Sequence, residues 1–121
     1  MHELGIAQNI LQIVQQSVPP HLASDVRGIR LRVGKLSGVV PDSLDFCFGV
    51  MVSQTEMTQA SLDIEQIPIV AKCKDCGHRF EMEDWSFSCP ACKGLSLDLI
   101  SGRELEVVEI VLAEDEGKKA L

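Results

Sequence analysis

The chain has 121 residues, of which 45% are hydrophobic, and a formal net charge of -7. This length suits one compact domain, or a small domain that carries a still smaller module. The acidic balance argues against a nucleic-acid partner, because phosphate binding depends on clustered Lys and Arg. No secretory leader is evident, and no apolar run approaches the roughly 20 residues of a membrane-spanning helix. We therefore expect a soluble, cytoplasmic protein without a membrane partner.

Three segments of the N-terminal half carry regular apolar patterns. Apolar residues recur at steps of three and four over residues 4–18, as one face of a helix requires, until two prolines end the pattern. Residues 26–36 alternate apolar with basic side chains, which predicts a half-buried strand with a basic outer face. Residues 42–55 again show helical steps, with acidic residues near the positive end of the helix dipole, and predict a second helix.

The C-terminal half predicts two more strands around a cysteine-rich insert. Residues 61–70 alternate apolar and polar side chains, with a proline at the strand's end or on a sheet edge. Residues 104–114 form the third and most hydrophobic strand. We therefore predict an α+β fold in which two helices pack on one face of a small three-stranded sheet. Residues 1–71 plus 102–121 would form this α/β domain, and residues 72–101 an inserted module.

Four of the five cysteines lie in two pairs, Cys73-x2-Cys76 and Cys89-x2-Cys92, with twelve residues between the pairs. In a reducing compartment, pairs of this kind indicate metal ligation rather than disulfides. Two residues between the thiolates allow a tight turn to point both sulfurs at one ion. Two such turns complete the tetrahedral four-sulfur shell that zinc prefers, so the insert predicts a zinc-ribbon-like module.

The favoured occupant of this site is a structural zinc ion. The insert has few large apolar side chains beyond Phe80, Trp85 and Phe87, so we expect that it needs a metal in order to fold. A closed four-sulfur shell also leaves no position for water or substrate. A rubredoxin-like iron centre for electron transfer has the same ligands and remains an alternative. We expect Gly77 and Gly94, one after each pair, to supply the positive backbone angles that the turns need.

Three other side chains have plainer interpretations. His78 would enter the metal shell only if a cysteine left it, so we interpret it as an exposed loop histidine. His21, after the two prolines, is interpreted as a solvated loop residue. Cys47 lies on the apolar face of the second predicted helix and indicates a buried core thiol.

The sequence Met1-His2-Glu3 precedes the first helical pattern and offers several metal donors. A free α-amine is partly deprotonated at neutral pH, and the first amides of a helix have no intrahelical acceptor. Together with the His2 imidazole these nitrogens suit Ni(II) or Cu(II), and Glu3, Asp42 or water could complete the shell. A histidine at position two is also commonly just a mobile polar residue. At this point both interpretations stay open.

Several motifs together resemble the HypA/HybF family of hydrogenase-maturation nickel metallochaperones. They are the opening "MHE", the apolar helix after it, "KLSGVVPDSLDFCF", and the pairs "CKDCGH" and "CPAC" before a terminal hydrophobic strand. The resemblance covers essentially the whole chain. It implies a protein that is not an enzyme and that binds Ni(II) as transient cargo in the α/β domain. It also implies transfer of the nickel, with a HypB-like GTPase, to the large subunit of [NiFe]-hydrogenase.

The resemblance also assigns roles to individual residues. It implies that His2 is the essential nickel ligand, that Met1 and Glu3 offer further donors, and that Asp42 is an acidic residue near the nickel. It matches four residues to zinc ligands: Cys73, Cys76, Cys89 and Cys92. The oligomeric state stays open between a monomer and a homodimer.

A second class of function is a zinc-ribbon protein or nucleic-acid interaction module without nickel cargo. The acidic composition opposes it, but one predicted strand face is basic. That face carries Arg27, Arg30, Arg32 and Lys35.

Overall fold

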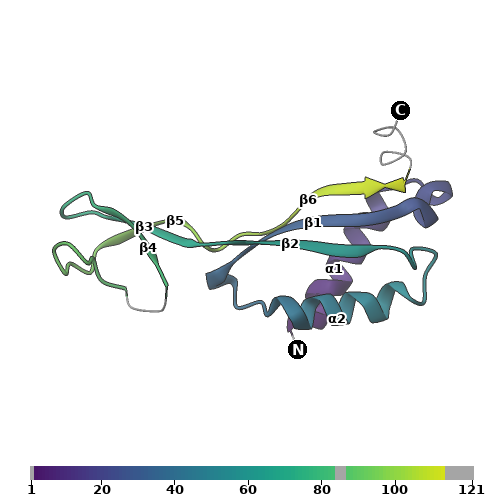
Figure 1. Cartoon of the computed structure of the whole chain (residues 1–121), viewed down its shortest axis with the longest axis horizontal. Coiled ribbons are helices and arrows are strands. Elements are labelled where there is room, and N and C mark those ends of the chain that lie inside the picture. The colour runs from purple at the N-terminus through teal and green to yellow at the C-terminus, as the bar shows by residue number, and fades with distance from the viewer. Residues whose placement is uncertain (1, 84–86, 114–121) are drawn as a thin grey trace. The chain divides into compact units, whose positions relative to one another are not determined.

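The computed structural model describes residues 2–83 and 87–113, with only the backbone described for His2 (Figure 1). The chain divides into two compact units. The first, here called the helical unit, comprises Met1–Leu31, Val39–Glu65 and Glu106–Leu121. The second, here called the cysteine unit, comprises Arg32–Gly38 and Gln66–Leu105.

The helical unit contains two α-helices and a three-stranded sheet. The helices are α1 (His2–Ser17) and α2 (Pro41–Val52). In the sheet, β1 (Val26–Gly34) lies between β2 (Ser61–Ile67) and β6 (Leu105–Leu112), as Figure 1 shows. Each helix was expected within a few residues of its observed ends, so the apolar periodicity identified both helices of this unit correctly.

The core of the helical unit is formed by the apolar faces of both helices and of β1. On α2 the buried residues are spaced by four, and on β1 they alternate with polar positions, as the two periodicities require. These buried side chains include Ala7, Ile10 and Val14 of α1, Leu44, Phe48 and Val52 of α2, and Ile29 and Leu31 of β1. The predicted α+β fold, with two helices packed on a small three-stranded sheet, is thereby confirmed.

Two short 3₁₀ helices connect the regular elements. One of them, η1 (Pro20–Asp25), carries the exposed His21 and follows the two prolines that end α1. The other, η2 (Lys35–Ser37), lies in the cysteine unit before the left-handed Gly38. In the part of the chain that the structure describes, no helix is long and apolar enough to cross a membrane.

The cysteine unit is built on a second three-stranded sheet. Its central strand β3 (Ile69–Cys73) pairs antiparallel with β4 (Arg79–Met82) and with β5 (Leu97–Ser101). The buried side chains of this sheet form a small cluster of Ile69, Ala71 and Met82, with partly buried neighbours that include Leu36, Phe80, Leu97 and Leu99. Such a small apolar cluster leaves much of the unit's stability to other sources.

The strand predicted over residues 61–70 ends directly before Pro68, which is one of the two roles predicted for this proline, but the residues beyond it form a second strand that was not predicted. The segment forms two strands, because Pro68 interrupts the run and the residues after this proline form the central strand of the second sheet. Proline has no N–H to donate to a ladder, so a strand that reaches it commonly ends there. The Pro68 carbonyl instead accepts a hydrogen bond from Ser101 Oγ at 2.7 Å.

The cysteine unit extends beyond the predicted insert of residues 72–101. The segment Arg32–Gly38 belongs to it, as the amide of Gly34 donates to the carbonyl of Glu104 at 2.7 Å and that of Leu36 to Gly102 at 2.7 Å. The division into an α/β nickel-binding domain and a metal-binding module over residues 72–101 stays a prediction.

Candidate metal centre

The two cysteine turns share one backbone hydrogen-bond pattern. In each turn the amide of the first cysteine donates to the carbonyl five residues later, and the amide four residues later donates back to the first cysteine's carbonyl. The two distances are 2.8 and 2.9 Å in the turn that starts at Cys73, and 2.9 and 2.7 Å in the turn that starts at Cys89. Two turns of the same shape therefore present their sulfurs in the same way.

The positive backbone angle of each turn falls four residues after its first cysteine. In the first turn this residue is Gly77, with φ of 78°, as predicted. In the second turn it is Lys93, with φ of 62°, so the expectation that Gly94 supplies this angle is wrong. At Gly94 a Cβ would lie 2.7 Å from Asp75 Oδ2 and 3.2 Å from Cys92 Sγ, so a larger residue there would require the exposed Asp75 carboxylate to move.

The four paired cysteines converge on one point. Their sulfur atoms all lie within 4.8 Å of one another. The Sγ atoms of Cys73 and Cys92 are 3.6 Å apart, and so are those of Cys76 and Cys89. A tetrahedral zinc site with Zn–S bonds near 2.3 Å has sulfurs separated by about 3.8 Å. The donor set and its spacing therefore fit a tetrahedral metal ion.

The electrostatics of the cluster favour a cation among the four sulfurs. Burial opposes the thiolate of Cys89, yet backbone amides, that of Cys92 foremost, lower its pKa to about 7. At Cys92 the Gly94 amide favours the thiolate, but the neighbouring sulfurs, Cys73 first, raise its pKa to about 12. One thiolate therefore forms readily and the last one forms with difficulty, unless a positive ion lies between them.

His78 follows the first cysteine pair. It is exposed, as predicted, and its ring stacks on Phe80 with centroids 5.7 Å apart and planes inclined by 13°. Its carbonyl accepts the hydrogen bond from the amide of Cys73 described above.

A hollow of about 390 Å³ lies where the first turns of α1 and α2 meet. Glu3 and Asp42, two of the predicted nickel-site residues, both line this hollow. Glu3 Oε2 accepts a hydrogen bond of 3.0 Å from the amide of Val40, the residue that precedes α2. Met1 and the side chain of His2 lie outside the described residues. The nickel-ligand roles of these four residues stay predictions.

The contact between Glu3 and Val40 was not predicted from the sequence. The two residues are 37 positions apart, and the backbone amide of an apolar residue gives no sequence signal. The one available hint was that α2 begins without a polar residue at the position where Ser, Thr, Asp or Asn usually caps a helix.

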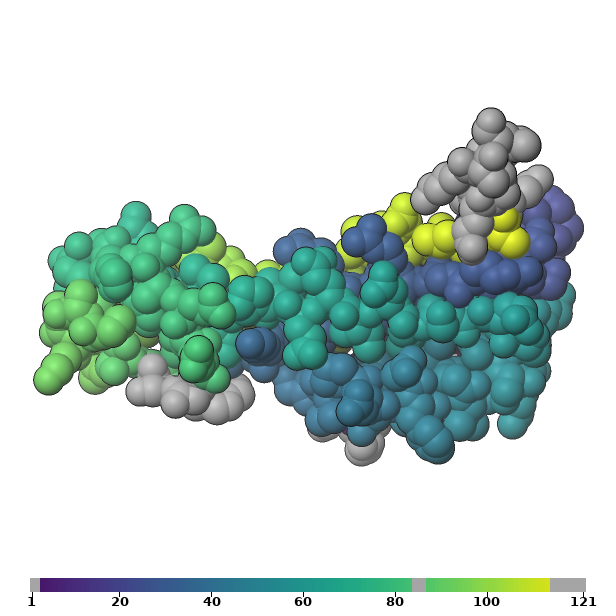
Figure 2. Space-filling model, in the orientation of Figure 1, coloured from purple at the N-terminus to yellow at the C-terminus, as the bar shows by residue number. Residues whose placement is uncertain are grey.

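The predicted burial of Cys47 is wrong. Cys47 is only half-buried and lines the same hollow as Glu3 and Asp42. The inner face of α2 is set by Leu44, Phe48 and Val52, so position 47 falls at its border. The outer side of α2 lies at the surface (Figure 2), where the side chain of Phe46 is 73% exposed.

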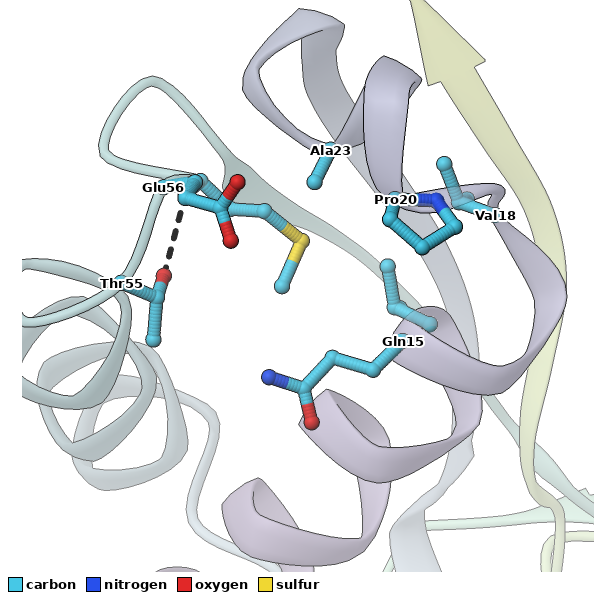
Figure 3. A pocket seen from close by; sticks show the side chains of 8 residues that line it. Gln15, Val18, Pro20, Ala23, Thr55 and Glu56 are labelled. Carbon is cyan, nitrogen blue, oxygen red and sulfur yellow. Dashed lines mark hydrogen bonds between the residues drawn. The ribbon is translucent and has the colours of Figure 1, made fainter.

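A second hollow of about 210 Å³ lies near the C-terminal end of α1 (Figure 3). In Figure 3, Gln15 and Pro20 line one side of it and Thr55 and Glu56 the opposite side. Met57 also lines the hollow, and its amide donates to Thr55 Oγ1 at 3.0 Å. Its ionisable lining residue is Glu56. Among the described residues, the metal-binding geometry is found at the cysteines and not in this hollow.

Two arginines of the basic face of β1 have polar partners within the chain. Arg30 forms ion pairs with Glu109 at 3.0 Å and with Asp63 at 3.7 Å, and the hydrogen bond from Arg30 to Glu109 foremost raises the pKa of Arg30. Arg27 donates to the carbonyl of Ser24 at 2.8 Å. The carboxylate partners of Arg30 reduce the positive field that this face offers to a polyanion and so weaken the support for a nucleic-acid partner.

The chain matches one known protein family over most of its length. A family model described as "Hydrogenase/urease nickel incorporation, metallochaperone, hypA" matches residues 1–112. The chain belongs to the HypA family. This match confirms the resemblance seen in the opening residues and the cysteine pairs. The HypA family is described as a metallochaperone family, which is a class of metal carriers rather than of catalysts.

Curated HypA relatives match nearly the full length of the chain. One, the hydrogenase maturation factor HypA of Desulfatibacillum aliphaticivorans, is 48% identical over 98% of this chain and 92% of its own length. Another, from Desulfosudis oleivorans, is 44% identical over 94% of this chain and 100% of its own length. The relationship therefore includes both units of the structure.

Two solved HypA structures share the fold. The solution structure of the Ni metallochaperone HypA from Helicobacter pylori superposes with a TM-score of 0.60, at 17% identity over 91% of this chain and 96% of that one. A second HypA solution structure gives a TM-score of 0.65 at 18% identity, over 93% and 96% of the two chains. The similarity of these two structures shows that the chain has the same fold.

Proposed function

We propose that this HypA-family protein binds Ni(II) at its N-terminus as exchangeable cargo and delivers it during maturation of [NiFe]-hydrogenase. The family match over residues 1–112 is the observation that carries the proposal, since it includes both the N-terminal motif and the cysteine pairs. Curated relatives named hydrogenase maturation factors give the direction of delivery.

The proposed nickel donors are gathered at the start of α1. His2 supplies its imidazole, and Met1 supplies its α-amine. The helix begins at His2, so the amides of His2 and Glu3 need no intrahelical acceptor and are available to a metal. Nitrogen donors of this kind suit Ni(II). Asp42 lines the hollow beside Glu3, which supports a role for its carboxylate near the nickel.

The proposed resident metal is a structural zinc ion held by four thiolates. Its ligands are Cys73, Cys76, Cys89 and Cys92, whose sulfur spacing fits a tetrahedral ion. When bound, zinc would neutralise the thiolates and join the two cysteine turns. The chain itself orients the ligands: the backbone amide of Gly94, for example, donates to Cys92 Sγ at 3.4 Å.

The proposed partners follow from the delivery of nickel. We propose a HypB-like GTPase and the large subunit of [NiFe]-hydrogenase as partners, in the cytoplasm. Carrier function requires only moderate nickel affinity, because the carrier must release its cargo to the next protein. A nucleic-acid partner is disfavoured by the acidic composition and by the ion pairs of Arg30 with Glu109 and Asp63.

The test is to replace His2 by alanine in protein with an unblocked N-terminus. We expect the wild-type protein to bind nickel stoichiometrically in titration calorimetry and His2→Ala to lose that binding, with zinc content unchanged by metal analysis. His21→Ala is the matched control, because His21 is an exposed histidine of η1 and should leave nickel binding intact. Unchanged nickel affinity in His2→Ala would sink the proposal.

A further inference from the structure

We propose that Glu3 is a positioning residue, whose carboxylate holds the start of α2 rather than serving as a nickel ligand. The inference deepens the proposed nickel site and rests on it. It concerns the way in which two separate helices are kept in place around the cargo.

The hydrogen bond from the Val40 amide to Glu3 Oε2 is the central observation. At 3.0 Å it joins the first turn of α1 to the residue that precedes α2. Val40 has no polar side chain with which to cap the helix, and the next residue, Pro41, has no N–H. The acceptor at this helix start therefore comes from α1. A carboxylate is a suitable acceptor, because hydrogen bonds to ionised groups are strong and the helix dipole favours negative charge there.

The Glu3–Val40 hydrogen bond connects the two segments that carry His2 and Asp42. Glu3 follows His2 directly, and Asp42 follows Val40 by two residues in the first turn of α2. Glu3 and Asp42 line one hollow. Fixing Val40 to Glu3 therefore fixes the backbone that carries Asp42 relative to the backbone that carries His2.

A nickel-ligand role and a positioning role predict different results for glutamine at position 3. The side-chain oxygen of glutamine can still accept a hydrogen bond from the Val40 amide, so Glu3→Gln keeps the link in weaker form. The amide oxygen of glutamine carries no charge and is a much poorer ligand for a divalent cation than a carboxylate. Alanine removes both properties.

The experiment measures nickel affinity and Val40 amide exchange in the full-length protein with an unblocked N-terminus. In nickel-free solution, with zinc retained, hydrogen exchange at the Val40 amide should rise about tenfold in Glu3→Ala and change little in Glu3→Gln. Nickel affinity should fall about tenfold in Glu3→Ala and by less than about threefold in Glu3→Gln. Asp45→Asn is the matched control, because it removes a carboxylate from α2 without touching the Glu3–Val40 bond, and should leave both readings unchanged.

Three other outcomes would overturn the inference, and the last of them would overturn the proposed function as well. Equal loss of nickel affinity in Glu3→Gln and Glu3→Ala, with Val40 exchange unchanged in Glu3→Gln, would make the carboxylate a ligand and overturn the inference. Wild-type nickel affinity in Glu3→Ala would overturn it as well. If the wild-type protein binds no nickel, the proposed function fails and this inference fails with it.

Discussion

Lys93 holds a left-handed backbone conformation that side chains rarely adopt. Its φ of 62° matches the 78° of Gly77 at the same place in the other cysteine turn. Glycine reaches this region without steric cost, whereas a residue with a Cβ loses about 1–2 kcal/mol there. The second turn therefore keeps an unfavourable backbone angle that the first turn avoids.

We predict that Lys93→Gly stabilises the zinc-loaded protein by up to about 1 kcal/mol, because the left-handed cost disappears while the unfolded chain gains some freedom. The reciprocal change, Gly77→Ala, should destabilise it by roughly 1 kcal/mol, since open space around Gly77 leaves the backbone angle as its sole constraint. Chemical denaturation of the two variants measures both effects. If the wild type and both variants were equally stable, the left-handed backbone angle would have no energetic cost in either turn, which would contradict the prediction.

At the scale of elements, each cysteine turn is attached to regular structure. Cys73 is the last residue of β3, and the second pair precedes β5, which pairs with β3. Cys73 and Cys89, the first cysteine of each pair, are buried, whereas Cys76 and Cys92 are exposed. The sheet therefore positions Cys73 directly, whereas the backbone of the two turns positions the other three sulfurs.

We predict that zinc binding to the metal-free protein at pH 7 releases roughly two or more protons per ion. The pKa of Cys76 is raised and that of Cys92 is raised to about 12, so both thiols are protonated at pH 7 without metal and must lose their protons to bind it. A falling pH therefore weakens zinc binding, and a rising pH strengthens it. A pH indicator in weakly buffered solution counts the protons. Zinc uptake without proton release would show that the thiols do not ligate the ion.

At the scale of the whole molecule, the two compact units differ in how they can be stabilised. The helical unit buries large side chains such as Phe48, Ile29 and Leu31 in its own core. The buried apolar cluster of the cysteine sheet is small and includes Ile69, Ala71 and Met82. Small units of this kind usually require a metal or disulfides.

We predict that removing zinc with a chelator unfolds the cysteine unit and leaves the helical unit folded. Amide exchange should rise strongly at Ala71 in β3, which is fully buried, and remain slow at the equally buried Ile29 in β1. Adding zinc back should restore protection at Ala71. Loss of protection at both positions would mean that the two units unfold together, and unchanged protection at both would mean that the metal is not structural.

Most of the secondary structure was predictable from local patterns. The helices and β1 follow from apolar periodicity, and β6 follows from the hydrophobic run near the C-terminus. The error at residues 61–70 arose because alternation continues on both sides of Pro68, whereas the two halves pair with different neighbours. Local pattern contains no information on which strand will be the partner.

The sequence by itself determined the candidate metal-binding cysteines and the resemblance to the family, because fixed spacings such as Cys-x2-Cys bring possible ligands together through local turns alone. It also determined which faces of α1 and α2 are apolar. Only the tertiary structure decided that Lys93 rather than Gly94 takes the left-handed angle, that Cys47 borders a hollow, and that Glu3 binds the Val40 amide. These features depend on backbone geometry and on contacts between residues far apart in the chain, and the local order of residues determines neither of them.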